Sequence, residues 1–277
     1  MRTDDLADFI FNRHSIWQAR QEGHPKPWTG DEILQKYRFC NVYRELDTVT
    51  RWIADEWRTP NAGDPDLWFA MAVARWVNWP DTLNEIGYPV PWDPDNFIEN
   101  IYSRRNRGLK VWTGAYMIGT QGNAKDKPLF IAENVLQPLW DRREELRPRP
   151  GMTLEEFARP IINIKNQGTF MVGQIVADIK YAEPYLLGAD DWWTWTVSGP
   201  GSRRGLNRVL GRDLTKGWND KDFRAAMEPL REAVNEELPP WMPQLHAQDL
   251  QNCLCEFDKY ERVRLGQGRP RSLYPGR

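Results

Sequence analysis

Hydrophobic side chains recur every three or four residues through most of the chain, and this spacing predicts helices. The longest such segment runs from Asp31 to Trp57. Its apolar stripe consists of Phe39, Val42, Leu46, Val49, Ile53 and Trp57. Asp31 suits the N-cap position and Pro60 lies just past the expected end. We therefore expect one long amphipathic helix over this segment.

The same spacing predicts further helices along the chain. The expected ranges are 66–79, 94–106, 134–146, 153–165, 168–181, 220–238 and 247–262. Pro80 should stop the first of these, and 94–106 and 134–146 should be shorter or kinked helices. Thr153 and Glu156 have capping-box spacing. Residues 110–118 are the best candidate for a strand, although their alternation is imperfect.

The chain has 277 residues, which is enough for one large domain or two small ones. It shows no internal repeat and no low-complexity linker that would mark a boundary. We therefore expect an all-α fold with little or no β structure, in a single domain over 1–277. Two lobes within it are expected at about 1–145 together with the C-terminal helix, and at 146–240.

Charge is nearly balanced, with 37 Lys and Arg against 39 Asp and Glu, so no overall basic field indicates nucleic acid. Basic residues nevertheless gather in three runs, at Ser103–Lys110, at Gly201–Arg212 and from Arg262 to the C-terminus. Each run alone is typical of a solvated surface. The three together favour a polyanionic partner.

The three cysteines, Cys40, Cys253 and Cys255, are too few for a disulfide framework. The Cys-x-Cys pair has only His246 nearby and makes a poor zinc signature, so no metal ligand is predicted. No N-terminal apolar segment and no long apolar run are present. We therefore expect a cytoplasmic protein, in the host cytoplasm if it is viral, with no membrane partner.

Fifteen tryptophans are far more than usual for this length. We expect most of them to pack against helices, since tryptophan buries a large apolar area and keeps one polar group. For some of them the alternative is a stacking surface for nucleobases.

Two predicted helices carry charged rows that could perform chemistry. On the helix over 31–57, Cys40, Arg44, Asp47 and Arg51 fall opposite the apolar stripe, with Tyr43 on the flank. This row is either a surface ladder of salt bridges or a pair of guanidiniums that a carboxylate holds toward phosphate.

The helix over 247–262 has an apolar face and a second row formed by Gln251, Cys255, Asp258 and Arg262, with Lys259 beside it. Asp258 could act as a general base or could orient Arg262. Cys255 has no histidine to lower its pKa, so we interpret it as a small packing residue. The simplest hypothesis places the polar rows of the two helices across one cleft.

A glycine-rich segment, "GPGSRR", follows a loop after the helix that ends near Tyr181 and leads into another helix. Glycines allow close approach of the backbone, and a helix N-terminus offers N–H donors to phosphate. No strand precedes this segment, which excludes dinucleotide-binding and P-loop motifs.

Three blocks of the sequence resemble a phage family that acts in thymine hypermodification. They are "KYRFCNVYRELDTVTRWI", "NQGTFMVGQIVADIKY" and "LQNCLCEFDKYERVRLGQGRPR", and the resemblance runs from about Phe9 to Arg271. The family includes α-glutamyl/putrescinyl thymine pyrophosphorylases, amino acid:DNA transferases and the helical domain attached to 5-hydroxymethyl-deoxyuridine (5-hmdU) DNA kinases. The chain has no kinase P-loop, so it is not itself the kinase.

The resemblance implies a fold similar to helix-hairpin-helix DNA glycosylases. The implied substrate is double-stranded DNA in which a kinase has converted 5-hydroxymethyluracil to its 5-pyrophosphoryloxymethyl form. The implied reaction releases pyrophosphate and attaches a free amino acid or amine, with glycine and serine as candidates. Glycosylases hold their catalytic aspartate at the start of a helix that here reads "GPGSRR". The missing carboxylate argues against N-glycosidic cleavage and fits a scaffold that flips a base for other chemistry.

That reaction assigns a role to each candidate residue. Cations that take up the charge on pyrophosphate are Arg44, Arg51, Arg262 and Lys259. Carboxylates that could deprotonate or position the amine are Asp258 or Asp47, with Glu45 or Glu256 less favoured. Residues that could hold the pyrimidine or other parts of the substrate are Asn41, Tyr43, Gln174 and Gln251. Asp178 either binds the amino group or is a surface acid. Residues expected to bind DNA are Arg203, Arg204, Arg208, Arg269 and Arg271.

No cofactor is required by this scheme, and Mg²⁺ on the pyrophosphate is left open. Two alternatives to the transferase remain. One is a non-catalytic DNA-binding helical module that assists a 5-hydroxymethyluracil DNA kinase, and the other is a glycosylase-like enzyme.

Overall fold

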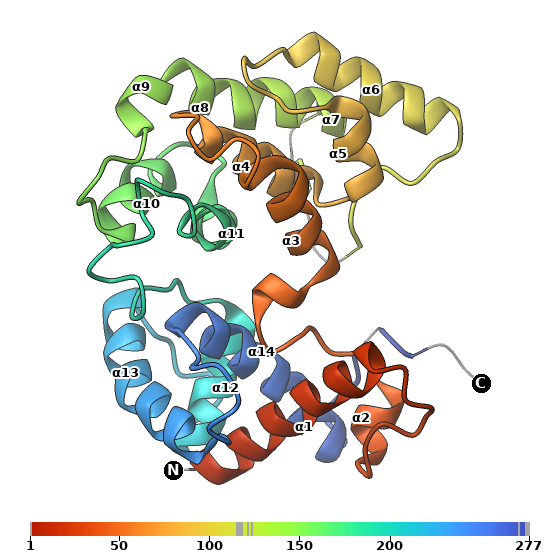
Figure 1. The fold of residues 1–277 in the computed structure, drawn as a ribbon, viewed down its shortest axis with the longest axis vertical. Coiled ribbons are helices and arrows are strands. Elements are labelled where there is room, and N and C mark those ends of the chain that lie inside the picture. The colour runs from red at the N-terminus through yellow and green to blue at the C-terminus, as the bar shows by residue number, and fades with distance from the viewer. Residues whose placement is uncertain (1, 115–118, 121, 123, 271, 275–277) are drawn as a thin grey trace. The chain divides into compact units, whose positions relative to one another are not determined.

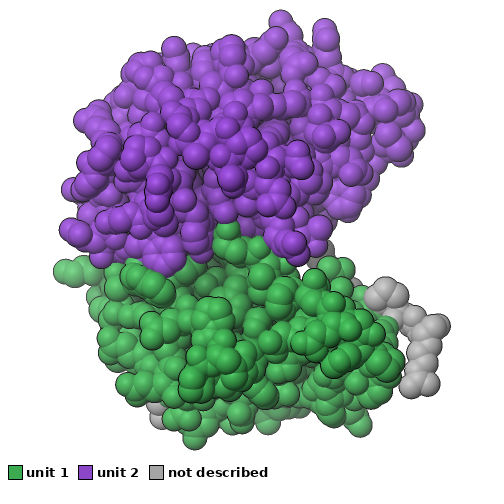
Figure 2. All heavy atoms as spheres, in the orientation of Figure 1, with its two compact units in different colours: residues 1–47, 193–277 green, residues 48–192 purple. Residues whose placement is uncertain are grey.

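A computed structural model describes residues 2–114, 119–120, 122, 124–270 and 272–274 (Figure 1). The regular structure of the described residues is helical and includes no strand, which confirms the expected all-α fold. They form two compact units. Unit 1 comprises residues 1–47 and 193–277, and unit 2 comprises residues 48–192 (Figure 2). None of the described helices has the length and apolar character needed to cross a bilayer.

Unit 1 is built from both ends of the chain. Its helices are α1 (Thr3–Gln21), α2 (Glu32–Lys36), the 3₁₀ turn η1 (Arg44–Leu46), α12 (Pro200–Leu210), α13 (Asp220–Glu237) and α14 (Ala247–Arg264). Apolar side chains from α1, α12, α13 and α14 share one buried core, which includes Leu6, Ile10, Leu206, Leu230 and Leu254. Because α1 and α14 contribute to the same core, the N-terminal and C-terminal segments stabilise each other.

The closest helix packing in unit 1 is between α12 and α14. A Cβ added to Gly205 would lie 2.0 Å from the carbonyl oxygen of Leu254, and one added to Gly201 would lie 2.4 Å from Sγ of Cys255. Only glycine lets two helices approach this closely. The crossing at Gly201 and Gly205 therefore brings the arginines of α12 onto the surface of α14.

Unit 2 surrounds α4 (Leu67–Val77), every residue of which is buried. Its other helical segments are α3 (Thr48–Ile53), the π-helical turn η2 (Ala54–Arg58), α5 (Pro80–Ile86), α6 (Pro94–Asn106), α7 (Lys127–Leu129), the π-helical turn η3 (Phe130–Leu136), α8 (Gln137–Asp141), α9 (Arg143–Leu146), α10 (Leu154–Ile162) and α11 (Gly168–Ile179). The main partner of α4 is α11, which is also buried over most of its length. A helix that is buried all round and apolar except for Arg75 needs neighbours on every side, and this arrangement supplies them.

Most of the predicted helices are confirmed. α6 spans the predicted range, and α10 begins with the predicted capping box, in which the hydroxyl of Thr153 accepts a hydrogen bond from the N–H of Glu156. The segment over 134–146 is broken into η3, α8 and α9, which agrees with the expectation of a shorter or kinked helix. Pro80 does more than end a helix. α4 ends at Val77, its C-cap Asn78 has a left-handed φ of 49°, and Pro80 occupies the first turn of α5.

The strand predicted over 110–118 is absent from residues 110–114, and residues 115–118 lie outside the described residues. The described part of the chain contains one isolated antiparallel bridge, between Tyr37 and Leu273.

The prediction of a single helix over 31–57 is wrong. α2 ends at Lys36, and the chain then runs without regular structure to η1 before α3 starts at Thr48. Local hydrogen bonds compete with the helix at this point: Asn41 donates its amide to the carbonyl of Leu46, and Asp47 accepts the N–H of Asn41. The guanidinium of Arg13 donates to the carbonyls of Cys40 and Asn41.

One consequence is that Arg44, Asp47 and Arg51 do not form one helical face. Arg44 and Asp47 belong to unit 1, and Arg51 is an exposed residue of α3 in unit 2. The hypothesis of two polar helix faces across one cleft requires a helix over 31–57, and this helix does not form.

Candidate functional site

Helix α14 contains four carboxylates that are almost completely buried, namely Asp249, Glu256, Asp258 and Glu261. An ionised carboxylate away from water is costly unless cations or N–H donors surround it. Three of the four have an arginine or lysine partner, and Asp249 lies 3.1 Å from the ring of His246 and accepts the N–H of Arg44. The acids of α14 therefore hold cationic side chains from neighbouring segments in fixed positions.

Asp258 is the centre of the most highly charged of these groups. Nε of Arg208 donates to its Oδ1 at 2.9 Å, and Nε of Arg204 donates to its Oδ2 at 3.0 Å. Nε of Arg262 lies 3.4 Å from the same Oδ2. We name these four residues the Asp258 cluster. It places three positive charges around one negative charge.

Two side chains of the cluster are buried and the other two are partly exposed to solvent. Asp258 is fully buried and the side chain of Arg208 is 6% exposed, whereas those of Arg204 and Arg262 are 39% and 33% exposed. Arg208 also donates to Oε1 of Gln267 at 2.9 Å. Guanidiniums fixed by a carboxylate and partly open to solvent are suited to a phosphate or pyrophosphate group, since their N–H groups match its oxygens.

Both oxygens of Asp258 are occupied by arginines. A general base needs an oxygen that can approach the proton it removes, so this arrangement favours the alternative in which Asp258 orients Arg262. Asp258 also orients two further arginines, Arg204 and Arg208. The row of residues on α14 alone did not predict these two contacts.

A second ion pair on α14 lies between Glu256 and Lys259. Glu256 also accepts the N–H of Cys40 through Oε2 at 3.3 Å. Burial alone would lower the pKa of Lys259, but the adjacent Glu256 carboxylate outweighs it and raises the pKa. Lys259 therefore stays positively charged at neutral pH, with about a third of its side chain exposed.

The cysteines of α14 are protonated at neutral pH. Burial raises the pKa of Cys253 to about 11 and also raises that of Cys255. Sγ of Cys255 lies against Gly201 at the helix crossing. This placement fits a packing residue and supplies no thiolate nucleophile.

The residues predicted to hold parts of the substrate are divided between the two units. Tyr43 is buried, and its hydroxyl donates to the carbonyl of Pro243 at 2.6 Å. Asn41 is engaged in the loop described above, and Glu45 is half-buried in η1. Gln251 is half-buried on α14, near Gly199 at the start of α12. Gln174, by contrast, is buried on α11 in unit 2.

Asp178 is not a surface acid, because it is completely buried in unit 2. It makes two hydrogen bonds with the guanidinium of Arg75, which also donates to Thr50 at 2.9 Å and to Asn78 at 3.1 Å. The pair ties α11 to α4 and α3, and this is a structural role. A substrate amino group would have to displace Arg75 to reach it.

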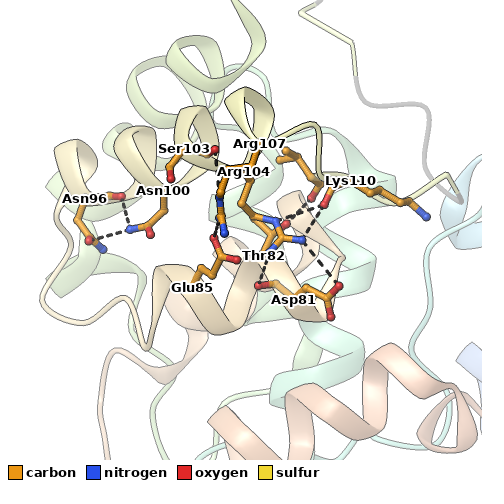
Figure 3. Close-up of polar contacts among 10 residues, drawn as sticks. Asp81, Thr82, Glu85, Asn96, Asn100, Ser103, Arg104, Arg107 and Lys110 are labelled. Carbon is orange, nitrogen blue, oxygen red and sulfur yellow. Dashed lines mark hydrogen bonds and ion pairs between the residues drawn. The ribbon is translucent and has the colours of Figure 1, made fainter.

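The basic run at 103–110 is held within unit 2. Arg104 is buried, donates to the carbonyls of Asp81 and Lys110, and pairs with Glu85 (Figure 3). Arg107 pairs with the other oxygen of Glu85. Acids thus neutralise much of this run, so it adds little to a polyanion-binding surface.

The other arginines expected to bind DNA are placed differently. Arg203 lies on α12 with its side chain 39% exposed and donates through Nε to the hydroxyl of Ser198. Arg269 is exposed after the end of α14. Arg271 lies outside the described residues.

Comparison with known proteins identifies the family of the chain. The family described as "5-hmdU DNA kinase, helical domain" matches residues 1–269. The chain belongs to this family. A 5-hmdU DNA kinase of Bacillus phage SP10 is 25% identical to it over 227 residues, which cover 73% of this chain and 35% of that kinase. The chain thus spans about a third of the length of this relative. No solved structure was found to match it.

This membership confirms the resemblance to the helical domain of 5-hmdU DNA kinases. All four residues of the Asp258 cluster lie within the matched range of this helical domain. Sequence reasoning assigned Arg204 and Arg208 to DNA binding and missed their contact with Asp258. The four-residue spacing of Gly201 and Gly205 is the signal that could have indicated a close helix crossing at these arginines.

Proposed function

We propose that this helical-domain protein is a DNA base-modifying transferase. It displaces pyrophosphate from 5-pyrophosphoryloxymethyl-deoxyuridine in DNA with an amino acid or amine, glycine being the first donor to test. The observation that carries the proposal is the Asp258 cluster, in which three arginines from two helices are fixed on one buried carboxylate. Membership of a family named for 5-hmdU DNA kinases supports a substrate derived from 5-hmdU.

The reaction breaks the bond between the 5-methylene carbon and the pyrophosphate oxygen and forms a carbon–nitrogen bond in its place. The departing pyrophosphate takes the bonding electron pair, and the amine loses a proton. Negative charge grows on the leaving group in the transition state, so fixed cations accelerate the step. Arg204 and Arg262 are the exposed members of the cluster and bind the pyrophosphate in this scheme.

Other residues of unit 1 have supporting roles in the proposal. Asp258 and Arg208 position the two exposed arginines, and Lys259 adds a nearby positive charge. Asp47 is the carboxylate proposed to take the proton of the amine, with Glu45 as the alternative. Glu256 is less suited, because Lys259 and the N–H of Cys40 occupy its two oxygens. Asp178 and Gln174 are left out of this scheme, because each is buried in unit 2. A DNA kinase supplies the substrate.

The decisive experiment uses duplex DNA that contains 5-pyrophosphoryloxymethyluracil. The protein is incubated with this DNA and a mixture of amino acids, the DNA is digested to nucleosides, and their masses are read while pyrophosphate is assayed. A new nucleoside that carries one amino acid, with an equal amount of pyrophosphate, supports the transferase and identifies the donor. Release of free base in place of pyrophosphate would indicate a glycosylase-like enzyme.

A second candidate function is a non-catalytic DNA-binding module that assists a DNA kinase. It is favoured by the comparison with the phage SP10 kinase, of which the matched segment is only 35%. In that case the nucleosides remain unchanged in the assay above, while the protein binds DNA and increases the rate of a separately added 5-hmdU DNA kinase.

A further inference from the structure

Unit 1 contains a cavity of about 270 Å³ formed by α1, α2, the segment between them and the segment near the C-terminus. Ile16 and Leu34 form its apolar floor and are almost fully buried. Trp28 and Tyr274 form aromatic walls, with ring centroids 5.5 Å apart and planes at 74°. Pockets for drug-sized ligands span about 300 to 1,000 Å³, so this cavity fits a single ring system.

Cations surround the aromatic walls. The guanidinium carbon of Arg20 lies 5.6 Å from the ring of Trp28 and 5.7 Å from that of Tyr274. Nζ of Lys26 lies 5.2 Å from the ring of Trp28, and Lys36 lines the cavity on the side of α2. No acid is present among the described residues that line it. The chemistry therefore matches a flat aromatic group that carries negative charge.

The walls are held in place by hydrogen bonds that leave the cavity open. Nε1 of Trp28 donates to the carbonyl of His24 at 2.8 Å. The N–H of Tyr274 donates to the carbonyl of Lys36 at 3.2 Å, and that of Arg38 donates to the carbonyl of Ser272 at 3.1 Å. Aromatic rings fixed in this way lose little conformational entropy when a ligand stacks on them.

We propose that this cavity binds one unpaired nucleobase of a DNA strand. The base stacks against Trp28 and Tyr274, and Arg20, Lys26 and Lys36 bind the phosphates on either side of it. Aromatic platforms beside a positively charged rim are the usual means of binding single-stranded nucleic acid without sequence preference. Three separate cations suit a strand with successive phosphates better than a free nucleoside monophosphate, which has a single phosphate. The inference does not depend on the transfer reaction.

Photochemical crosslinking of the full chain tests the contact directly. An oligonucleotide with one unpaired 5-iododeoxyuridine is irradiated with the protein, and crosslinked peptides are identified by mass spectrometry. We expect crosslinks at Trp28 or Tyr274 that an unlabelled oligonucleotide suppresses. Crosslinks confined to other residues would overturn the proposal. Crosslinking by free 5-iododeoxyuridine monophosphate alone, with none by the oligonucleotide, would overturn the assignment to DNA.

Binding affinities of matched variants provide an independent test. Trp28→Ala should weaken oligonucleotide binding by roughly 5- to 100-fold, while Trp28→Phe keeps most of it. The control is Trp241→Ala, which removes a tryptophan of unit 1 that is 53% exposed and lies outside the cavity. Equal weakening by the control would contradict the proposal. The double variant Lys26→Gln, Lys36→Gln leaves the aromatic walls intact and should reduce the salt dependence of binding. This variant tests the proposal even if Trp28→Ala has a folding defect.

Discussion

Gly205 of α12 lies directly against the backbone of Leu254 of α14. A Cβ at Gly205 would be 2.0 Å from the carbonyl oxygen of Leu254, which no ordinary contact allows. Asp258 is one helical turn further along α14, and it meets Arg204 and Arg208 on either side of this glycine. The packing of two helix backbones and the formation of the charged cluster are therefore one structural feature.

The variant Gly205→Ala should separate α12 from α14. Because the obstacle is backbone rather than a flexible side chain, we expect a loss of at least about 1–3 kcal/mol in the free energy of unfolding, measured by urea denaturation. Gly217→Ala is the matched control, since a Cβ there meets nothing within 4 Å. Unchanged stability in Gly205→Ala would show that the two helices do not cross at this point.

Removal of one exposed cation of the cluster should affect catalysis more than folding. Arg262→Gln leaves Asp258 with two hydrogen-bonded arginines, so the melting temperature should change little. The rate of pyrophosphate release should fall by about 10²-fold, the usual effect of removing one group that stabilises transition-state charge. Arg159→Gln is the control, because Arg159 is 67% exposed on α10 in unit 2. A full rate for Arg262→Gln would exclude this arginine from the site.

Asp258→Asn should have the opposite balance of effects. Loss of the buried charge leaves Arg208 buried without its anionic partner, and we expect destabilisation of about 3–5 kcal/mol. The measurement is the free energy of unfolding from urea titrations, compared with Asp190→Asn, an exposed acid. If Asp258→Asn were as stable as the unmodified chain and only inactive, Asp258 would be a base and not a positioning residue.

Hydrophobic periodicity predicted where most of the helices lie, and α4, α6, α10, α11, α13 and α14 lie at the predicted positions. The aligned row of Gln251, Cys255, Asp258 and Arg262 was also visible in the sequence. The sequence did not show which helix covers this row. Hydrophobic periodicity indicates that a helix face is covered, but it does not identify the helix that packs on it. The close contact at Gly205 selects α12, and that contact depends on tertiary packing.

The prediction of one helix over 31–57 was wrong for a different reason. Its apolar spacing is real, but Asn41 and Asp47 form local hydrogen bonds that replace helical ones. Arg13, which lies on α1, donates to the carbonyls of Cys40 and Asn41. These residues are distant from Arg13 in the sequence. A pattern confined to one segment contains no information about such a distant donor.

Stability should fall in acid through Glu261. Burial would raise the pKa of this carboxyl, but hydrogen bonds from Arg264 and Arg2 outweigh burial and lower it from 4.5 to about 2. A carboxyl with a lowered pKa in the folded state contributes stability that is present above pH 4.5 and lost between pH 4.5 and 2. Because both arginines are more than a third exposed, we expect a contribution of about 1–2 kcal/mol.

The measurement is the free energy of unfolding of Glu261→Gln and of the unmodified chain, determined in urea between pH 2 and 7. The variant should be less stable at pH 7, and the difference should shrink as the pH falls below 4.5, because protonated Glu261 resembles glutamine. Glu237→Gln, at the exposed end of α13, should track the unmodified chain at every pH. A difference for Glu261→Gln that stays constant with pH would mean that the two arginines do not hold this carboxylate in its ionised form.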